Sequence, residues 1–194
     1  MNLIDVSNQI VNSLFPNEIW TEQYKNVFVA NSRTPKSSVQ KTIFEKEFLM
    51  AKIASDKGHI VFLLPEDSKE KSPDALLDSE YTEFKNVIGN ENSVSHRFRE
   101  ALHQGRNVYL KIDSNIKVKR IKQIIAGVLK EKNNDGKIYC YVTRLDEMYV
   151  WNMLDLKQNK APEGALSLPQ ADKNQNSDTF NITQIIKKSS EETN

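Results

Sequence analysis

Residues 73–87 read PDALLDSEYTEFKNV, and this stretch predicts a β-hairpin at the centre of the fold. Apolar and aromatic residues recur in two short runs, at about 74–77 and 80–87, and the Asp78-Ser79 pair between them is typical of a tight turn. Pro73 fits at a strand entrance, where a missing N–H does little harm. Glu83 and Lys85 are two positions apart on the second strand, so their side chains point to the same face.

Helices and strands are predicted on both sides of this hairpin. Before it, we expect a helix over 38–57 that Ser37 or Ser38 can cap and Gly58 can close, a continuous apolar strand in HIVFLLPE, and a charged loop over 66–72. After it, we expect a helix over 94–104 that ends at Gly105, a strand in NVYLKID, an amphipathic helix over 116–131, a strand in KIYCYVT and a last ordered piece over 147–156.

The order of these elements predicts an α/β fold with a central mixed sheet of about four to five strands, flanked by helices. Residues 2–30 predict two helical segments that break at Pro16-Asn17, the second running from Glu18 to about Ala30. The chain is therefore predicted to have three regions: a helical N-terminal extension over 1–37, an α/β domain over 38–156, and a polar, flexible tail over 157–194. The tail has a possible docking segment around 180–186.

Composition narrows the classes of protein. The chain has 194 residues, of which 38% are hydrophobic and 27% charged, as in a globular domain with a tail. It has neither an apolar run of about 20 residues nor the pattern of a secretory signal peptide. We therefore expect a cytoplasmic protein that does not bind membranes. The single cysteine, Cys140, excludes an internal disulfide and a cysteine-based zinc cluster, and its apolar strand pattern predicts a core residue.

Positive charge is local. The formal net charge is only +1, yet the segment from Ser95 to Lys132 contains ten basic residues and only three acidic ones. This segment is either the solvated face of two helices or a surface that contacts phosphates. On the first of those helices and just after it, the candidate substrate-binding residues are Arg97, Arg99, His103 and Gln104.

A candidate catalytic constellation lies on the hairpin. Asp74 sits one short hairpin before Glu83, so the two carboxylates can converge, and paired carboxylates suit a hard divalent cation such as Mg²⁺ or Mn²⁺. Lys85 can orient a water molecule or stabilise developing negative charge. An acid-x-Lys triplet is weak evidence by itself, since it also occurs at Asp67, Asp135 and Asp155. Only Glu83 combines the triplet with a strand, a preceding Pro-Asp and flanking helices.

The pattern Pro73-Asp74 … Glu83-Phe84-Lys85 resembles the PD-(D/E)XK nuclease superfamily. Within it, the stretch from Glu47 to Asp113 is most similar to the C-terminal toxin nuclease domains of bacterial contact-dependent inhibition systems and to related phage and mobile-element proteins. The resemblance implies a metal-dependent nuclease, with tRNA as the best-known substrate of the toxins, and an inhibitor protein as a possible partner. It carries an acidic catalytic role onto Glu47, metal binding onto Asp74 and Glu83, and the lysine role onto Lys85. Glu45 is an alternative to Glu47; the two lie about 200° apart on a helix, so only one can face the site.

Two other functions stay open at this point. A metal-independent ribonuclease would use His and Arg residues to form a cyclic phosphate. A non-catalytic module for binding nucleic acid or protein would keep the fold without the chemistry. Chelation separates the first from a metal-dependent nuclease, and calorimetry with Mg²⁺ or Mn²⁺ separates the second.

Overall fold

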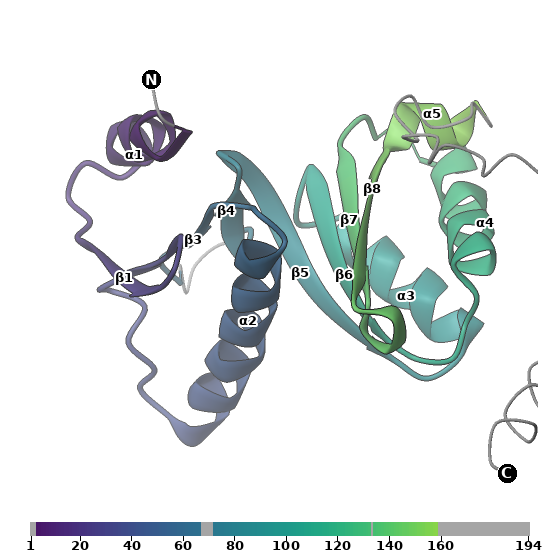
Figure 1. Cartoon of the computed structure of the whole chain (residues 1–194), viewed down its shortest axis with the longest axis horizontal. Helices are drawn as coiled ribbons and strands as arrows, with labels where there is room; N and C mark the ends of the chain where they lie inside the picture. The colour runs from purple at the N-terminus through teal and green to yellow at the C-terminus, as the bar shows by residue number, and fades with distance from the viewer. Residues whose placement is uncertain (1–2, 67–71, 133, 159–194) are drawn as a thin grey trace, which may run out of the picture. The chain divides into compact units, whose positions relative to one another are not determined.

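Helices and strands are interspersed along the chain (Figure 1). The structure is a computed structural model and describes residues 3–66, 72–132 and 134–158, all of which lie in one unit, Met1–Pro162. The elements are α1 (Leu3–Leu14), β1 (Trp20–Tyr24), β2 (Val27–Ala30), α2 (Ser38–Asp56), β3 (Val61–Leu63), β4 (Ala75–Leu77), β5 (Glu80–Ile88), α3 (Glu91–Ala101), β6 (Asn107–Asp113), α4 (Val118–Lys130), β7 (Lys137–Val142), a 3₁₀ turn η1 (Thr143–Leu145), β8 (Glu147–Asn152) and α5 (Met153–Lys157). The predicted tail and its docking segment lie almost entirely outside the described residues.

The strands form one mixed sheet in which β1 to β8 follow one another in sequence order. The pairs β2–β3, β5–β6 and β6–β7 are parallel, and the other pairs are antiparallel. The predicted α/β class and mixed sheet are confirmed. The predicted size of four to five strands is wrong, because the sheet has eight.

Two of the additional strands come from the N-terminal region. The second helix predicted there, from Glu18 to Ala30, is wrong: β1 and β2 form an antiparallel hairpin that turns at Asn26, whose φ is +55°. The third additional strand, β8, covers most of the ordered piece predicted over 147–156. β2 also pairs with β3, some thirty residues further along the chain. This long-range pairing provides β2 with a buried, hydrogen-bonded edge that no local pattern reveals.

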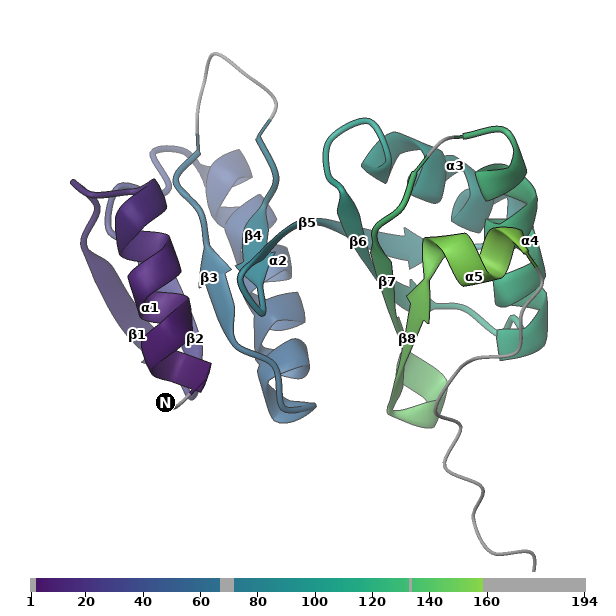
Figure 2. The same cartoon turned by 90° about the horizontal axis from the view of Figure 1, so that it is seen from above.

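Helices cover both faces of the sheet. Val11 of α1 packs with Phe62 and Leu76, whereas Met50 of α2 packs with Val61 and Leu77. These strand residues alternate in sequence and therefore point to opposite faces, and Figure 2 shows α1 and α2 on opposite sides of β2–β4. A further apolar cluster lies between α3, α4 and α5 and strands β5–β8.

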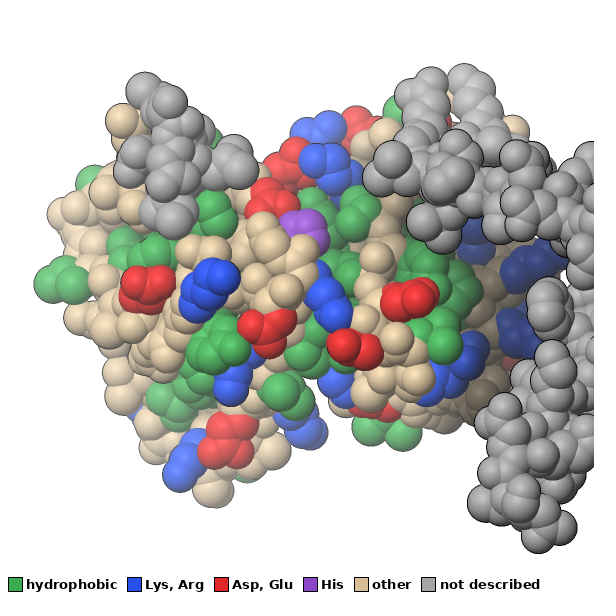
Figure 3. All heavy atoms as spheres, viewed as in Figure 1, with side chains coloured by type: hydrophobic (Ala, Val, Ile, Leu, Met, Phe, Trp, Pro, Cys, Tyr) green, Lys and Arg blue, Asp and Glu red, His purple; other side chains and the backbone are tan. Residues whose placement is uncertain are grey.

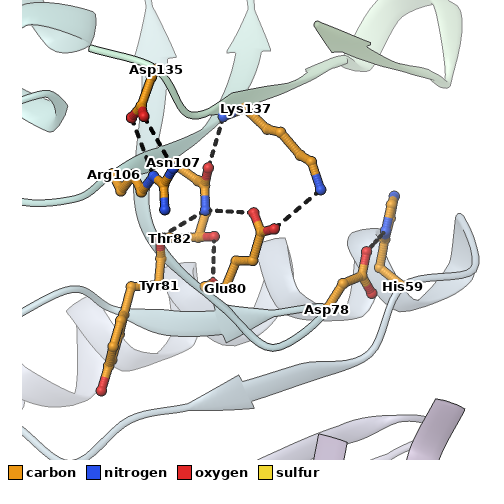
Figure 4. Close-up of polar contacts among 9 residues, drawn as sticks. All are labelled: His59, Asp78, Glu80, Tyr81, Thr82, Arg106, Asn107, Asp135 and Lys137. Carbon is orange, nitrogen blue, oxygen red and sulfur yellow. Dashed lines mark hydrogen bonds and ion pairs between the residues drawn. The ribbon is translucent and has the colours of Figure 1, made fainter. Parts of the chain in front are cut away.

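The hairpin predicted at residues 73–87 is confirmed as β4 and β5. Asp78 and Ser79 form its turn with φ of +49° and +71°, as a two-residue turn of the primed type requires. The Asp78 carboxylate accepts the Ile60 N–H at 3.0 Å. It also contacts His59 Nδ1 at 2.6 Å, as Figure 4 shows. The hairpin turn is thereby attached to the residues just before β3, and the two-residue turn sets the register of β4 and β5.

The helix predicted over 38–57 is also confirmed. The Ser37 side chain accepts the Gln40 N–H at its start, and Gly58 follows its end with φ of +95°. Both features match ordinary helix start and stop signals. Glu47 lies on this helix, α2, near the end of β3 and the start of β4.

Candidate functional site

The β4–β5 hairpin places Asp74, Glu83 and Lys85 together. Ala75 pairs with Thr82, so Asp74, one residue earlier, lies opposite Glu83 on the same face. The Phe84 N–H donates to Asp74 Oδ2 at 2.8 Å. Lys85 Nζ donates to Glu83 Oε1 and, at 3.2 Å, to Gln104 Oε1. The hairpin thus joins two carboxylates, an ammonium group and an amide from the segment after α3.

Glu47 of α2 completes a cluster of three carboxyl groups. Burial, followed by the charge of Asp74, raises the pKa of Glu47 to about 7 and the pKa of Glu83 also to about 7, from an ordinary 4.5. Glu45 is exposed on the other side of α2, whereas Glu47 is half-buried. Of the two alternatives, Glu47 is therefore the one that faces this cluster.

Glu83 is the most enclosed of the three. Only 2% of the residue is exposed, and its Oε2 has no hydrogen-bond partner among the described residues. Gly105, after α3, lies directly against it: a Cβ on Gly105 would be 3.0 Å from Glu83 Cβ and 3.1 Å from Glu83 N. A side chain at this position would force Glu83 or the segment after α3 to shift by a few tenths of an ångström. The sequence predicted Gly105 as a helix end but not as a wall of the site.

Arg33 is a site residue that the sequence analysis missed. It lies in the segment between β2 and α2 and is 5% exposed. Its Nη1 donates to the carbonyl oxygens of Leu64 and Asp74, and its Nη2 to Glu47 Oε2 at 2.5 Å. A single arginine in a polar loop carries no sequence signal for such a role, because its partners lie 14 to 41 residues away.

The donor set fits a divalent cation only in part. Within the described residues, no group of three or more His, Cys, Asp and Glu side chains is arranged to hold a metal ion. Mg²⁺ commonly uses one or two carboxylates and takes its remaining ligands from water and substrate phosphate. Asp74 and Glu83 supply such a pair of hard oxygen donors, and the unpartnered Oε2 of Glu83 is a suitable ligand atom.

The predicted substrate-binding residues are spread over a wider area. Gln104 contacts Lys85, and His103 is exposed beside it. Arg97 pairs with Glu100 at 2.8 Å, and Arg99 pairs with Glu131 at 3.3 Å. The guanidinium groups of α3 therefore already have anionic partners, and their role in substrate binding stays a prediction.

The lysines of α4 differ from the arginines of α3. Lys119, Lys122 and Lys130 form no ion pair within the described part of the chain, although Arg120 of the same helix pairs with Glu91. On the face that Figure 3 draws, acidic and basic side chains are interspersed. Positive charge with no carboxylate partner is thus found on α4.

A second polar network, next to the hairpin, has a structural role (Figure 4). The buried Asn107 side chain donates to Glu80 at 3.0 Å and to the Tyr81 carbonyl at 3.2 Å, and it accepts the Lys137 N–H at 2.7 Å. It therefore ties together the amino ends of β5, β6 and β7.

Burial raises the pKa of the Cys140 thiol to about 12, which fits the predicted core position.

Residues 71–147 match a family model described as the contact-dependent growth inhibition CdiA C-terminal domain. The match covers less than half of the chain. It includes Asp74, Glu83, Lys85 and Gln104 but neither Arg33 nor Glu47. The predicted similarity to toxin domains of contact-dependent inhibition systems is confirmed over this range, and the PD-(D/E)XK assignment stays a prediction.

The comparison with solved structures yields a chain of the CdiA-CT/CdiI toxin and immunity complex from Burkholderia pseudomallei. The two are 19% identical with a TM-score of 0.47, and the alignment covers 61% of this chain and 92% of the other. No curated protein matches this chain in sequence. None of the described helices is long and apolar enough to cross a membrane.

Proposed function

We propose that the protein is a metal-dependent nuclease that hydrolyses phosphodiester bonds, with RNA, and in particular tRNA, favoured over DNA. The observation that carries this proposal is the cluster of Glu47, Asp74 and Glu83 with Lys85 at its edge. Two glutamates whose pKa values are raised by burial and by a neighbouring aspartate are an unfavourable arrangement for a structural surface and a common one for a catalytic site. The match of residues 71–147 to a toxin-domain family supports the same function.

Asp74 and Glu83 are the residues that would hold Mg²⁺ or Mn²⁺. When bound, such a cation polarises a phosphoryl oxygen and lowers the pKa of a coordinated water. Lys85 supplies a positive charge that Glu83 and Gln104 hold in place, and it can stabilise negative charge that develops on the phosphoryl oxygens. Burial of Glu83 keeps bulk water from weakening these interactions.

The substrate backbone requires a positive surface beside this cluster. The α4 lysines are the stronger candidates because the α3 arginines already pair with Glu100 and Glu131. Action in the cytoplasm, where cellular RNA is found, is part of the same proposal. The similar solved protein is a toxin in complex with an immunity protein, so a cognate inhibitor protein is part of the proposal.

The test is incubation with total tRNA, and separately with plasmid DNA, each with Mg²⁺ and with EDTA. We expect tRNA cleavage in Mg²⁺ that EDTA abolishes and that Glu83→Gln and Lys85→Ala also abolish. Glu45→Gln is the matched control, because Glu45 lies two residues from Glu47 but is exposed. Cleavage that persists in EDTA would favour the metal-independent ribonuclease. Nucleic-acid binding without cleavage and without metal binding would favour the non-catalytic module.

A further inference from the structure

Arg33 is a buried charge at the point where three segments of the chain meet. It follows β2 in the loop before α2, and 5% of the residue is exposed. Burying a guanidinium group is unfavourable unless its donors are used. Arg33 uses Nη1 for two carbonyl oxygens and Nη2 for one carboxylate, while its Nε has no partner among the described residues.

Two of the three partners of Arg33, Glu47 and Asp74, belong to the candidate site, and the third, Leu64, is buried in the adjacent core. Leu64 follows β3, Asp74 precedes β4, and Glu47 lies on α2. The Leu64 N–H also donates to the Asp74 carbonyl at 3.1 Å, beyond the last residue pair of β3 and β4. Arg33 therefore hydrogen-bonds both residues that make this contact. It therefore holds the backbone of one acid and the carboxylate of another with a single rigid group.

Asp74 is consequently fixed at two places. Arg33 holds its carbonyl oxygen at 3.0 Å, and the Phe84 N–H holds its carboxylate at 2.8 Å. Two ion pairs flank Asp74: Arg33 pairs with Glu47, and Lys85 pairs with Glu83. When all three carboxyl groups are ionised, they and the two internal cations leave one net negative charge, which a divalent cation would compensate.

We infer that Arg33 is a positioning residue for the metal site: its guanidinium group sets the position of Asp74 and Glu47 relative to Glu83. This inference rests on the proposed function. A lysine could supply the charge but not the fork of donors that reaches a carboxylate and two carbonyl groups at once. The region before α2 thus contributes to the site, although the sequence predicts it as a separate extension and the family match begins only at residue 71.

The experiment compares Mn²⁺ binding by isothermal titration calorimetry in the full chain and in Arg33→Lys, well below the melting temperature of each. Loss of a group that orients metal ligands typically lowers metal affinity about 10- to 100-fold, and we expect a loss of this size. Arg144→Lys is the matched control, since Arg144 is an exposed arginine that donates to the Ile116 carbonyl at 3.3 Å. It should bind Mn²⁺ as the wild type does.

A purely structural role predicts a different result: Arg33→Lys would lower the melting temperature but leave Mn²⁺ affinity unchanged, which would overturn the inference. If Arg33→Lys does not fold, the double variant Arg33→Met/Glu47→Gln removes both buried charges together. It should fold and bind Mn²⁺ at least about 10-fold more weakly than Glu47→Gln alone; equal affinity of these two variants would also overturn the inference.

Wild-type protein that binds no Mn²⁺ would overturn the proposed function and this inference together. Wild-type protein that binds Mn²⁺ but cleaves neither tRNA nor DNA would contradict the proposed nuclease alone. In that case, weaker Mn²⁺ binding by Arg33→Lys still supports the positioning role.

Discussion

Replacing Glu83 by glutamine is expected to stabilise the metal-free protein at pH 8 while abolishing cleavage. Glu83 is almost fully buried next to Asp74, and its pKa is raised from 4.5 to about 7. At pH 8 the carboxylate is ionised in both the folded and the unfolded states, but only the folded state holds it in a desolvated, negatively charged environment. Glutamine has nearly the same shape, carries no charge and can still accept a hydrogen bond from Lys85.

The size of the effect follows from the pKa. One pKa unit corresponds to about 1.4 kcal/mol, so a rise from 4.5 to about 7 destabilises the folded state by at most about 3.5 kcal/mol at pH 8. Since the folded protein holds more protons than the unfolded chain between these values, its stability falls as the pH rises through the window from about 4.5 to 7. At pH 5 the folded-state carboxyl group is protonated, and the benefit of glutamine is under about 1 kcal/mol.

The assay is urea denaturation in EDTA at pH 5 and pH 8, followed by circular dichroism. We expect the gain in unfolding free energy of Glu83→Gln over wild type to be about 2 kcal/mol larger at pH 8 than at pH 5. At the higher pH, this corresponds to a melting temperature several degrees above that of the wild type. Glu45→Gln, at an exposed position, should show no such difference. An equal effect of Glu83→Gln at both pH values would refute the reasoning, because Glu83 would then not lie in a charged, desolvated cluster.

Three further outcomes are expected. Lys85→Ala should abolish tRNA cleavage and lower the free energy of unfolding more at pH 8 than at pH 5, since it leaves the buried Glu83 without its cation; an equal loss at both pH values in denaturant titrations would contradict this. Gly105→Ala should destabilise the protein by about 1–3 kcal/mol, because its Cβ would meet Glu83, whereas Gly127→Ala in α4, where a Cβ has open space, should stabilise it by about 0.5–1 kcal/mol; thermal melts of both variants test the pair. Removing Lys119 and Lys130 together should reduce the slope of log affinity for single-stranded RNA against log salt by about 0.7 per lysine; filter binding at several salt concentrations measures the slope, and an unchanged slope would exclude α4 from the binding surface.

Local patterns in the sequence were sufficient to predict the β4–β5 hairpin and the face of it that carries Glu83 and Lys85. The alternation of residues in β5 placed Glu83 and Lys85 side by side, and the Asp78-Ser79 turn placed Asp74 near them. The cap at Ser37 and the glycine at Gly58 likewise mark the ends of α2. These features could be predicted because each depends on neighbours within a few residues, where backbone geometry alone dictates the direction of a side chain.

The remaining features depend on contacts between distant parts of the chain. The Val and Phe residues of β2 favour a strand, but its place in the sheet depends on the parallel edge that β3 offers. The choice of Glu47 over Glu45, the contact of Gln104 with Lys85 and the three bonds of Arg33 all depend on how α2, β3 and the segment after α3 pack around the hairpin. Such contacts determine which buried charges find a partner, and that balance of desolvation against pairing is set only when the tertiary structure forms.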